Sequence, residues 1–271
     1  MCGDKIPKRL EFITSAQEPT ENEEYDLVCA VDAAETHMLG VYGEKYADKI
    51  GLKIDHHPTG SLYGRSNHID GSASATGELI FKVIKFLEEV TGNKCLTPEA
   101  ATALYAAITS DTGCFQYSNV TSDTLRISAD LIDAGADKFG VCYRLFALKT
   151  MSEINAQRCM LSRMKFYCGG KLCFALFTNE DKAEYGIIDE DFGGLVSAMR
   201  EIEGVDLAIT ARQDSSEPTK FKVSMRSSEN VNASDLCALF GGGGHARAAG
   251  CAVTAASPKE AEQAILEKIN I

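Results

Sequence analysis

Short apolar runs alternate with segments of helical periodicity through the first half of the chain. The runs Asp26–Val31 and Leu52–Ile54 have the composition of buried strands, and residues 39–51 between them form a helical crossover. Residues Ser74–Val90 then repeat apolar side chains at the spacing of one helix face. This alternation predicts an α/β fold in which helices wrap a parallel sheet.

Start and stop signals predict three helices in this half of the chain. Ser74 and Thr76 are candidate N-caps for the first helix. Thr97 is the candidate cap of the second helix, because a proline and an acidic residue follow it. The third helix is expected over Ser122–Ala134, where a glycine closes it.

Strand-like patterns take over after residue 165. Phe166–Cys168 and Lys171–Phe177 predict a hairpin around two glycines, and two more strands are expected at Asp206–Arg212 and Phe221–Arg226. Helices are expected over Asp191–Ile202, Ala233–Leu239 and Pro258–Ile269.

These patterns divide the chain into two domains and a connector. We expect a parallel-sheet α/β domain over residues 1–140 and a smaller α/β domain over residues 166–271. A helical linker over residues 141–165 is expected to join them, and Thr150 and Glu153 form a capping-box pattern inside it. A length of 271 residues also favours two cores over one.

Charge and hydropathy narrow the class of protein. The formal net charge is −12, from 27 Lys plus Arg against 39 Asp plus Glu, which argues against a partner that is long duplex DNA. A small nucleotide site remains compatible, because bound divalent cations reverse the local field. No apolar run approaches the length of a membrane span, and no signal segment opens the chain, so we expect a cytoplasmic protein without a membrane partner.

Acidic and imidazole side chains follow the predicted strands. Asp32 follows the first strand, Asp55, His56 and His57 follow the second, and Asp111 ends the helix that begins at Thr97. Ligands of open α/β sheets bind at the carboxyl ends of the strands, so these groups are expected to face one crevice. Aspartate and histidine without thiolates suit Mn²⁺ or a similar divalent ion. Adjacent histidines on an extended chain point apart, so His56 and His57 are expected to have different roles.

A glycine-rich segment in the second half is the other candidate site. Gly241, Gly242, Gly243 and Gly244 precede His245, and Arg226 lies on a preceding strand. Glycine allows backbone N–H groups to approach a phosphate or a base, and arginine offers a planar fork for phosphate. The same glycines could equally form a loop that only ends the short helix before them.

Five motifs in this order resemble the DHH phosphoesterase superfamily. They are Asp32, the Asp55-His56-His57-Pro58 signature, Ser110-Asp111-Thr112-Gly113, Ser224-Met225-Arg226-Ser227 and the Gly-Gly-Gly-His loop that ends at His245. The likeness is stronger to the branch with a DHH-associated C-terminal domain. This branch comprises the nanoRNases, also called pAp phosphatases, which are relatives of the RecJ exonuclease.

The resemblance implies a Mn²⁺-dependent phosphodiesterase or phosphatase with two metal ions in the cleft between two domains. It makes Asp32 the carboxylate that bridges the metals, and it makes His56 and Asp111 ligands of the second metal. Asp55 is expected to orient His56, and His57 to face the scissile phosphate. In the second domain, Arg226, the glycines 241–244 and His245 are expected to hold the terminal phosphate and the base.

The same resemblance implies short RNA (nanoRNA), pAp or pApA as the substrate, and a homodimer through the first domain. One motif of the family, His-x-x-x-Asp-x-Asp in outline, is expected before Asp32 and is not found there. We therefore expect this DHH domain to be partial, without a strand-helix unit of about 30 residues.

Three other interpretations stay open at this point. The first is a catalytically impaired nucleotide-binding protein, because the first metal motif is missing. The second is a family II inorganic pyrophosphatase, which shares the Asp-His-His core. The third is an exonuclease acting on single strands, which the short chain and the absence of tryptophan make less favourable.

Overall fold

The computed structural model describes residues 6, 8–13 and 25–269 of the chain. The chain divides into two compact units, Met1–Leu148 and Lys149–Ile271, and each unit is described by itself. No helix of the described residues is long and apolar enough to cross a membrane.

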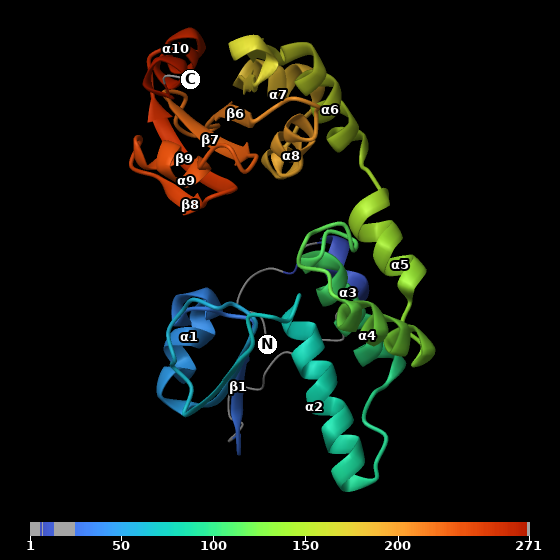
Figure 1. Ribbon diagram of the computed structural model, residues 1–271. Coiled ribbons are helices and arrows are strands. Elements are labelled where there is room, and N and C mark those ends of the chain that lie inside the picture. The colour runs from blue at the N-terminus through green and yellow to red at the C-terminus, as the bar shows by residue number, and fades with distance from the viewer. Residues whose placement is uncertain (1–5, 7, 14–24, 270–271) are drawn as a thin grey trace. The chain divides into compact units, whose positions relative to one another are not determined.

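A three-stranded parallel sheet forms the centre of the first unit (Figure 1). Its strands, in spatial order, are β1 (Val28–Val31), β2 (Ile50–Asp55) and β3 (Ser66–Ile69). The sequence analysis predicted β1 and β2 but missed β3, which is short and only partly buried. Because all three strands are parallel, their carboxyl ends meet at one edge of the sheet.

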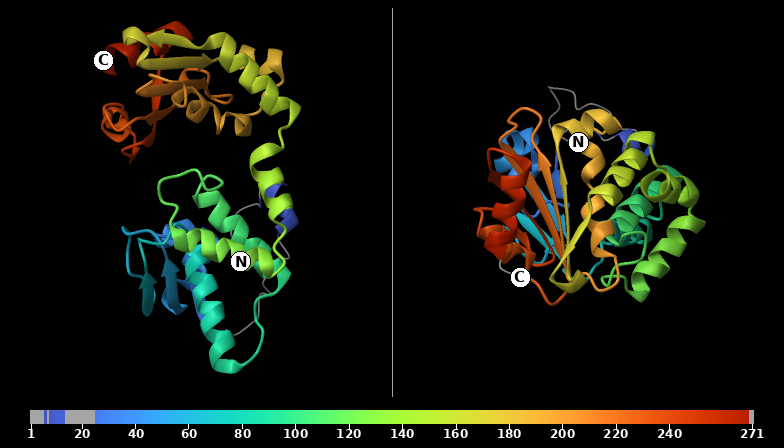
Figure 2. Two further views of the ribbon diagram at one scale, coloured as in Figure 1. Left: turned by 45° about the vertical axis from the view of Figure 1, so that its right-hand side comes forward. Right: turned by 90° about the horizontal axis from the view of Figure 1, so that it is seen from above.

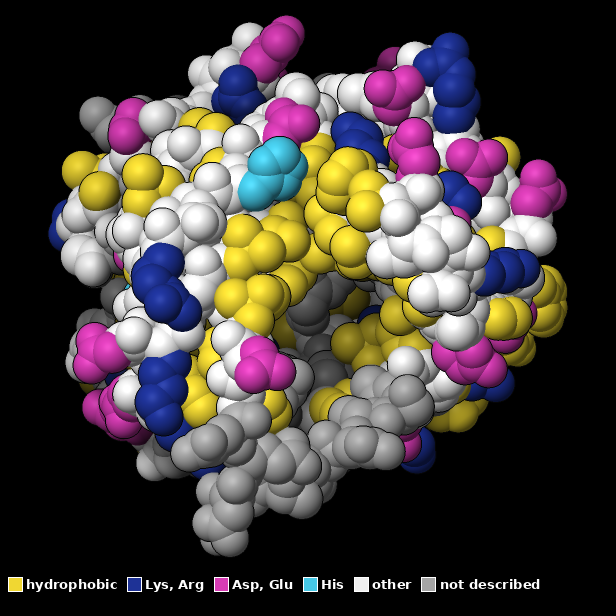
Figure 3. Space-filling model, turned by 90° about the horizontal axis from the view of Figure 1, so that it is seen from below, with side chains coloured by type: hydrophobic (Ala, Val, Ile, Leu, Met, Phe, Trp, Pro, Cys, Tyr) yellow, Lys and Arg dark blue, Asp and Glu magenta, His cyan; other side chains and the backbone are white. Residues whose placement is uncertain are grey.

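The crossover between β1 and β2 is helical, as predicted. It consists of the 3₁₀ turn Thr36–Leu39, the short helix α1 (Val41–Tyr46) and a second 3₁₀ turn, Ala47–Lys49. Within the described residues β1 pairs only with β2. A cavity of about 300 Å³ lies beside β1 and is lined by both apolar and polar groups, Asp32 among them. Figure 3 shows hydrophobic side chains gathered around a hollow on the face seen there.

Besides the 3₁₀ helix Lys8–Ile13, four further helices lie in the described part of the first unit. They are α2 (Thr76–Thr91), α3 (Pro98–Asp111), α4 (Ser122–Asp133) and α5 (Lys138–Cys142), and a π-helical turn, Tyr143–Ala147, follows the last of them. Thr97 caps α3 as predicted, because its side chain accepts a hydrogen bond from Ala100 N. A buried cluster that includes Tyr105, Ile108 and Leu131 fixes these helices to one another. Asp111 therefore ends a helix that the core holds in place.

Helix α6 (Met151–Arg163) belongs to the core of the second unit. The capping box of Thr150 and Glu153 at its start is confirmed. The helix buries Ala156, Cys159 and Met160 among the side chains of that core. It is thus part of a packed layer, whereas we expected residues 141–165 to form a linker.

A six-stranded mixed sheet forms the second unit. Its spatial order is β4 (Lys165–Tyr167), β5 (Leu172–Phe177), β6 (Leu207–Gln213), β7 (Lys220–Ser227), β9 (Ala248–Thr254) and β8 (Gly243–His245). Only β5 and β6 are parallel neighbours. The remaining helices are α7 (Asn179–Tyr185), α8 (Leu195–Arg200), α9 (Ala233–Ala238) and α10 (Pro258–Ile269). The α/β fold class predicted for both halves is confirmed, although α7, β8 and β9 were not anticipated.

The two faces of this sheet are covered differently. Helices α9 and α10 pack on one face, where Val223 and Met225 of β7 are buried. Helices α6 and α8 pack on the other face, over Cys173 of β5 and Ala208 of β6. The right panel of Figure 2 shows α10 (red) on one side of the orange strands and α6 (yellow) on the other. On the sheet face that α6 and α8 cover, every second residue of β7 is exposed or partly exposed. The two helices therefore leave these residues of β7 uncovered.

Candidate active site

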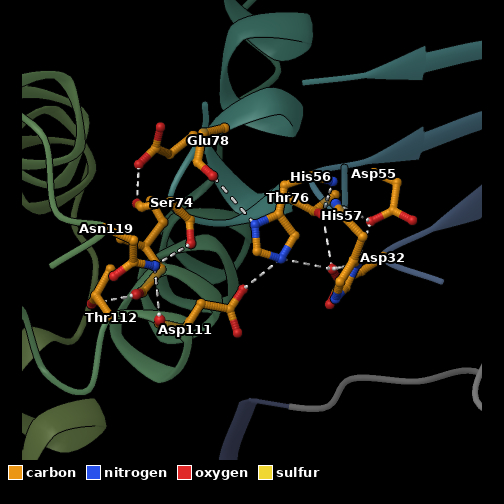
Figure 4. Close-up of polar contacts among 12 residues, drawn as sticks. Asp32, Asp55, His56, His57, Ser74, Thr76, Glu78, Asp111, Thr112 and Asn119 are labelled. Carbon is orange, nitrogen blue, oxygen red and sulfur yellow. Dashed lines mark hydrogen bonds and ion pairs between the residues drawn. The ribbon is translucent and has the colours of Figure 1, made fainter. Parts of the chain in front are cut away.

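Polar side chains gather at the carboxyl edge of the parallel sheet (Figure 4). Asp32 directly follows β1, and Asp55 ends β2 immediately before His56 and His57. Asp111 approaches from the end of α3, and its Oδ2 lies 3.6 Å from His56 Nε2. The structure therefore brings together all five first-domain site residues expected from the sequence.

A hydroxyl group on α2 holds Asp32. Asp32 has a left-handed φ of 58°, and its N–H still donates to Ile54 O of β2 at 3.0 Å. Its Oδ1 accepts a hydrogen bond from Thr76 Oγ1 at 2.8 Å, and the same hydroxyl accepts from His56 N at 3.2 Å. Thr76 thus joins the two strand ends.

The capping roles predicted for Ser74 and Thr76 are wrong. Ala75 occupies the N-cap position of α2, and no side chain caps the helix there. Thr76 lies inside the helix and its hydroxyl is used by the site, whereas the Ser74 hydroxyl donates to Glu78 of the same helix. Sequence alone could not separate these roles, because a hydroxyl at a helix start suits a cap equally well.

The ring of His56 is held so that one nitrogen faces two carboxylates. Its Nδ1 lies 3.3 Å from Ala73 O, and because a carbonyl oxygen only accepts, Nδ1 is the donor. Its Nε2 lies 3.7 Å from Asp32 Oδ1 and 3.6 Å from Asp111 Oδ2. In the neutral ring, Nε2 is then an acceptor that faces two other acceptors.

Asp111 is positioned through its own backbone. Asn119 Nδ2 donates to Asp111 O and to Ser74 O, at 3.1 Å each, and so links the end of α3 to the start of α2. Burial, and then the negative charge of Asp32, raise the pKa of the Asp111 carboxyl. The charges of His56 and His57 lower this pKa, but by less than burial and Asp32 raise it.

Asp55 contacts His57, which corrects the expectation that it orients His56. Its Oδ1 lies 2.7 Å from His57 Nδ1 and accepts from His57 N at 3.1 Å. The reason is the alternation of an extended chain, in which positions two apart share a side. Burial by itself would raise the pKa of Asp55, but the His57 hydrogen bonds and the charges of His57 and Lys53 hold it below its usual value.

The donor atoms fit a divalent cation. Asp32, His56 and His57 each offer a ligand atom within 4.8 Å of the others, and Asp111 adds a second carboxylate beside His56. The His57 nitrogen nearest to Asp32 is Nδ1, at 4.0 Å, and it is already engaged by Asp55. Asp32 Oδ1 and His56 Nε2 are therefore the best-placed pair of ligand atoms, whereas Asp111 Oδ2 lies near His56 Nε2 but outside the group of mutually close ligand atoms. Oxygen with imidazole donors suits Mn²⁺.

One buried group near this site was missed by the sequence analysis. Lys53 precedes Asp55 by two residues, and only 2% of its side-chain surface is exposed. Its ammonium lies 3.4 Å from Asp55 Oδ2. The available signal was a single lysine inside an otherwise apolar strand, because lysine is almost never fully buried without a partner.

The glycine-rich segment of the second unit forms a strand edge beside Arg226. Across the sheet, Arg226 of β7 pairs with Ala248 of β9, which pairs with His245 of β8. Directly paired residues project from the same face, so Arg226 and His245 flank the small side chain of Ala248. The neighbouring row is Ser224, Gly250 and Gly243.

We call these six residues the β7–β8 shelf. Ala208 of β6, which is buried under α6 and α8, pairs with Arg226, so the shelf continues the face that these helices leave uncovered. The small residues Ala248 and Gly250 of β9 form its floor. Arg226 stands on one side of this floor and His245 on the other. A flat ligand such as a base could lie on this floor beside an anion held by Arg226.

Arg226 is the cation of this region that is free to bind an anion. Its Nη1 donates only to its own neighbour, Met225 O, and no described carboxylate forms an ion pair with it. Lys222 on the same strand is paired with Asp214 at 2.7 Å. Arg247 donates to Ser228 O and Val231 O and so fixes the local backbone.

The four glycines have different structural requirements. A Cβ atom at Gly242 would lie 2.2 Å from Gly250 O and 2.5 Å from Cys251 Cβ. At Gly244, φ is +144°, and the backbone of β9 approaches within 2.7 Å of an added Cβ. Gly241 needs a φ of +73°, whereas Gly243 faces open space. The glycine segment therefore packs closely against β9 and leads into the edge strand β8, and it does more than end the preceding helix.

Comparisons with known proteins show which proteins the chain is similar to. Residues 169–270 match the DHHA1 domain family. The chain is 29% identical over 268 residues to the bifunctional oligoribonuclease and PAP phosphatase NrnA of Thermus thermophilus. The matched region covers 97% of this chain and 77% of the relative. The protein of the same name from Bacillus subtilis is 27% identical over 247 residues, covering 90% of this chain and 75% of the relative.

A solved structure shares the fold. An exopolyphosphatase-related protein from Bacteroides fragilis superposes with a TM-score of 0.86 at 22% sequence identity. The match covers 99% of this chain and 81% of the other.

Replacing Gly242 by alanine is expected to disrupt the shelf. Its new Cβ meets backbone atoms that cannot move aside cheaply, so we expect a destabilisation of about 1–3 kcal/mol and faster amide exchange in β8 and β9. Hydrogen–deuterium exchange measures the effect. Gly243→Ala is the matched control, since it adds a Cβ to open space in the adjacent residue. Equal protection in both variants would contradict the close approach at Gly242.

Proposed function

The chain belongs to the DHH superfamily of phosphoesterases, and from this premise we propose that it hydrolyses short oligoribonucleotides and pAp with the help of Mn²⁺. The names of the two NrnA relatives, oligoribonuclease and PAP phosphatase, support this substrate class. The β7–β8 shelf supports a substrate that carries both a base and a phosphate.

The observation that carries the proposal is that the carboxylates of Asp32 and Asp111 flank the Nε2 atom of His56. His56 Nε2 is aimed between the two carboxylates at 3.6–3.7 Å, which exceeds hydrogen-bonding distance. A cation bound beside Nε2 would offset the negative charge of these acceptors. We assign them as the ligands of the proposed Mn²⁺ site. When bound, such ions polarise a phosphoryl oxygen and lower the pKa of water.

The residues of the chain have separable roles around this site. Thr76 fixes the carboxylate of Asp32, and the Ala73 carbonyl fixes the His56 tautomer. Asp55 holds His57 Nδ1, which leaves His57 Nε2 free to meet the substrate. A protonated His57 at that position donates a hydrogen bond to a phosphoryl oxygen, and Asp55 stabilises its positive charge.

The second unit supplies recognition in this proposal. The Arg226 guanidinium can hold a terminal phosphate by two parallel hydrogen bonds. The glycine floor admits a base close to the backbone, and the exposed His245 ring can stack on it or donate to it. A pyrophosphatase would have no use for such a floor, so the shelf favours a nucleotide.

Turnover of a 5′-phosphorylated RNA dinucleotide and of pAp is the direct test. We expect Mn²⁺-dependent release of mononucleotide or of inorganic phosphate, and we expect His56→Ala to abolish it through loss of a metal ligand. His37→Ala is the control, because His37 is an exposed imidazole of a 3₁₀ turn. A wild-type chain that binds nucleotide without hydrolysing it would instead support the impaired nucleotide-binding protein.

His57→Ala separates substrate chemistry from metal binding. Because Asp55 already engages His57 Nδ1, we expect turnover to fall by on the order of 10²–10⁴-fold while Mn²⁺ affinity changes little. Steady-state kinetics and a Mn²⁺ titration followed by electron paramagnetic resonance measure the two effects. A near-normal rate would remove His57 from the mechanism, and a large loss of Mn²⁺ would make it a ligand.

Arg226→Ala tests the shelf. We expect KM for a 5′-phosphorylated dinucleotide to rise by roughly 10- to 100-fold, because a charge-assisted contact is lost. KM for a generic chromogenic phosphodiester without a terminal phosphate should stay unchanged. Lys220→Ala is the control, since it removes a cation at the other end of the same strand. Equal effects on both substrates would contradict a role in binding the terminal phosphate.

A further inference from the structure

Lys53 is a buried ammonium group in the middle of β2. Only 2% of its side-chain surface is exposed, and the neighbouring positions Leu52 and Ile54 pack with α2 on the other side of the strand. Removing an ammonium group from water is unfavourable unless each of its N–H groups finds a partner. Its contacts therefore indicate what the position does.

Three acceptors surround this ammonium group. Lys53 Nζ donates to Ala34 O and to Ser61 O, at 3.0 Å each, and lies 3.4 Å from Asp55 Oδ2. The number of acceptors equals the number of N–H groups on a lysine ammonium. The ring of Tyr63 lies 4.7 Å from Nζ and offers its π-face.

The acceptors come from the two loops that carry the candidate site. Ala34 lies two residues after Asp32, and Ser61 lies in the segment that follows His57. The same loops are tied to each other, because Ser61 N donates to Ala34 O at 3.1 Å and Tyr63 Oη donates to Ala33 O at 2.7 Å. Lys53 is therefore the charged centre of the junction between them.

Lys53 also forms the ion pair with one carboxylate oxygen of Asp55. Asp55 Oδ2 is buried and has no hydrogen-bond partner among the described residues, while Asp55 Oδ1 holds His57. The side chains of Lys53, Asp55 and His57 thus form a continuous chain from the junction of the loops to the imidazole.

We propose that Lys53 is a positioning residue of the active site: its ammonium group fixes the Asp32 loop against the Asp-His-His turn and holds the Asp55 carboxylate in the orientation that retains His57. This inference rests on the proposed function. It assigns Lys53 no contact with substrate.

Stability alone does not require a lysine at this position. Replacing a whole buried ion pair by packed apolar residues is often neutral or stabilising, whereas removing one partner leaves a buried charge without compensation. The lysine instead gives one defined geometry to two loops and a carboxylate. Its removal should therefore displace Asp55 and the two loops, in addition to any loss of stability from the buried carboxylate.

Lys53→Met is the first test, with Lys94→Met as the matched control at an exposed position between α2 and α3. We expect kcat for the RNA dinucleotide to fall on the order of 10- to 100-fold while KM changes by less than about threefold, because misplaced catalytic groups mainly affect the transition state. Circular dichroism and thermal unfolding should show a folded protein. Wild-type kcat in a folded Lys53→Met variant would overturn the proposal.

A readout independent of activity separates this proposal from the proposed function. In the metal-free protein, the His57 Nδ1 proton should give a slowly exchanging low-field NMR resonance, which should be absent in His57→Ala. We expect Lys53→Met to shift or lose this resonance and Lys94→Met to leave it unchanged. An unchanged resonance in Lys53→Met would overturn the proposal even if the wild-type chain showed no turnover.

Two more variants keep the test decisive if Lys53→Met folds poorly. Lys53→Arg retains the charge, and it should restore the His57 resonance and at least a tenth of wild-type kcat. Asp55→Asn combined with Lys53→Met should reduce kcat no further than Asp55→Asn alone, because Lys53 acts through Asp55 and the loops beside it. Fully multiplicative losses in kcat would show that Lys53 acts independently, and would overturn the proposal.

Discussion

The parallel pairing of β1 with β2 is the constraint on which the first-unit site depends. Both strands end at one edge, and the Asp32 N–H extends their hydrogen bonding to Ile54 O. Asp32 has a left-handed φ at that point, and its carboxylate meets the Thr76 hydroxyl of α2. A shift of one residue in the register would turn Asp32 or the Asp-His-His turn to the opposite side, so strand pairing and site geometry are a single property.

The second unit builds its candidate site by leaving part of a sheet uncovered. Helices α6 and α8 protect the side chains of β5 and β6, but their cover ends at β7. Small residues on β9 and β8 then let the surface stay flat without exposing a large apolar patch. Among the described residues, no carboxylate pairs with the guanidinium of Arg226, in contrast to Lys222, whose charge Asp214 neutralises.

The sequence predicted helices and strands better than it predicted contacts between side chains. The strands ending at Asp32 and Asp55 and the helix ending at Asp111 follow from local patterns, because burial and capping act over few residues. Strand β3 was missed because it is only four residues long and its first three residues are polar. Strand β8 was missed because glycines give no strand pattern. The roles of Thr76 and Lys53 depend on partners 44 and 19 residues away, so no local signal could assign them.

Side chains along β2 point alternately to the two sides of the sheet, and this alternation explains why the adjacent residues His56 and His57 have different partners. Leu52 and Ile54 face α2 and pack with Leu79, and His56 continues that side toward the Ala73 carbonyl and the Asp111 carboxylate. Lys53 and Asp55 face the opposite side, and His57 continues it. One side of the strand therefore leads to an imidazole held by a backbone carbonyl among carboxylates, which suits a metal ligand. The other leads to an imidazole backed by a buried carboxylate, which suits a charged hydrogen-bond donor.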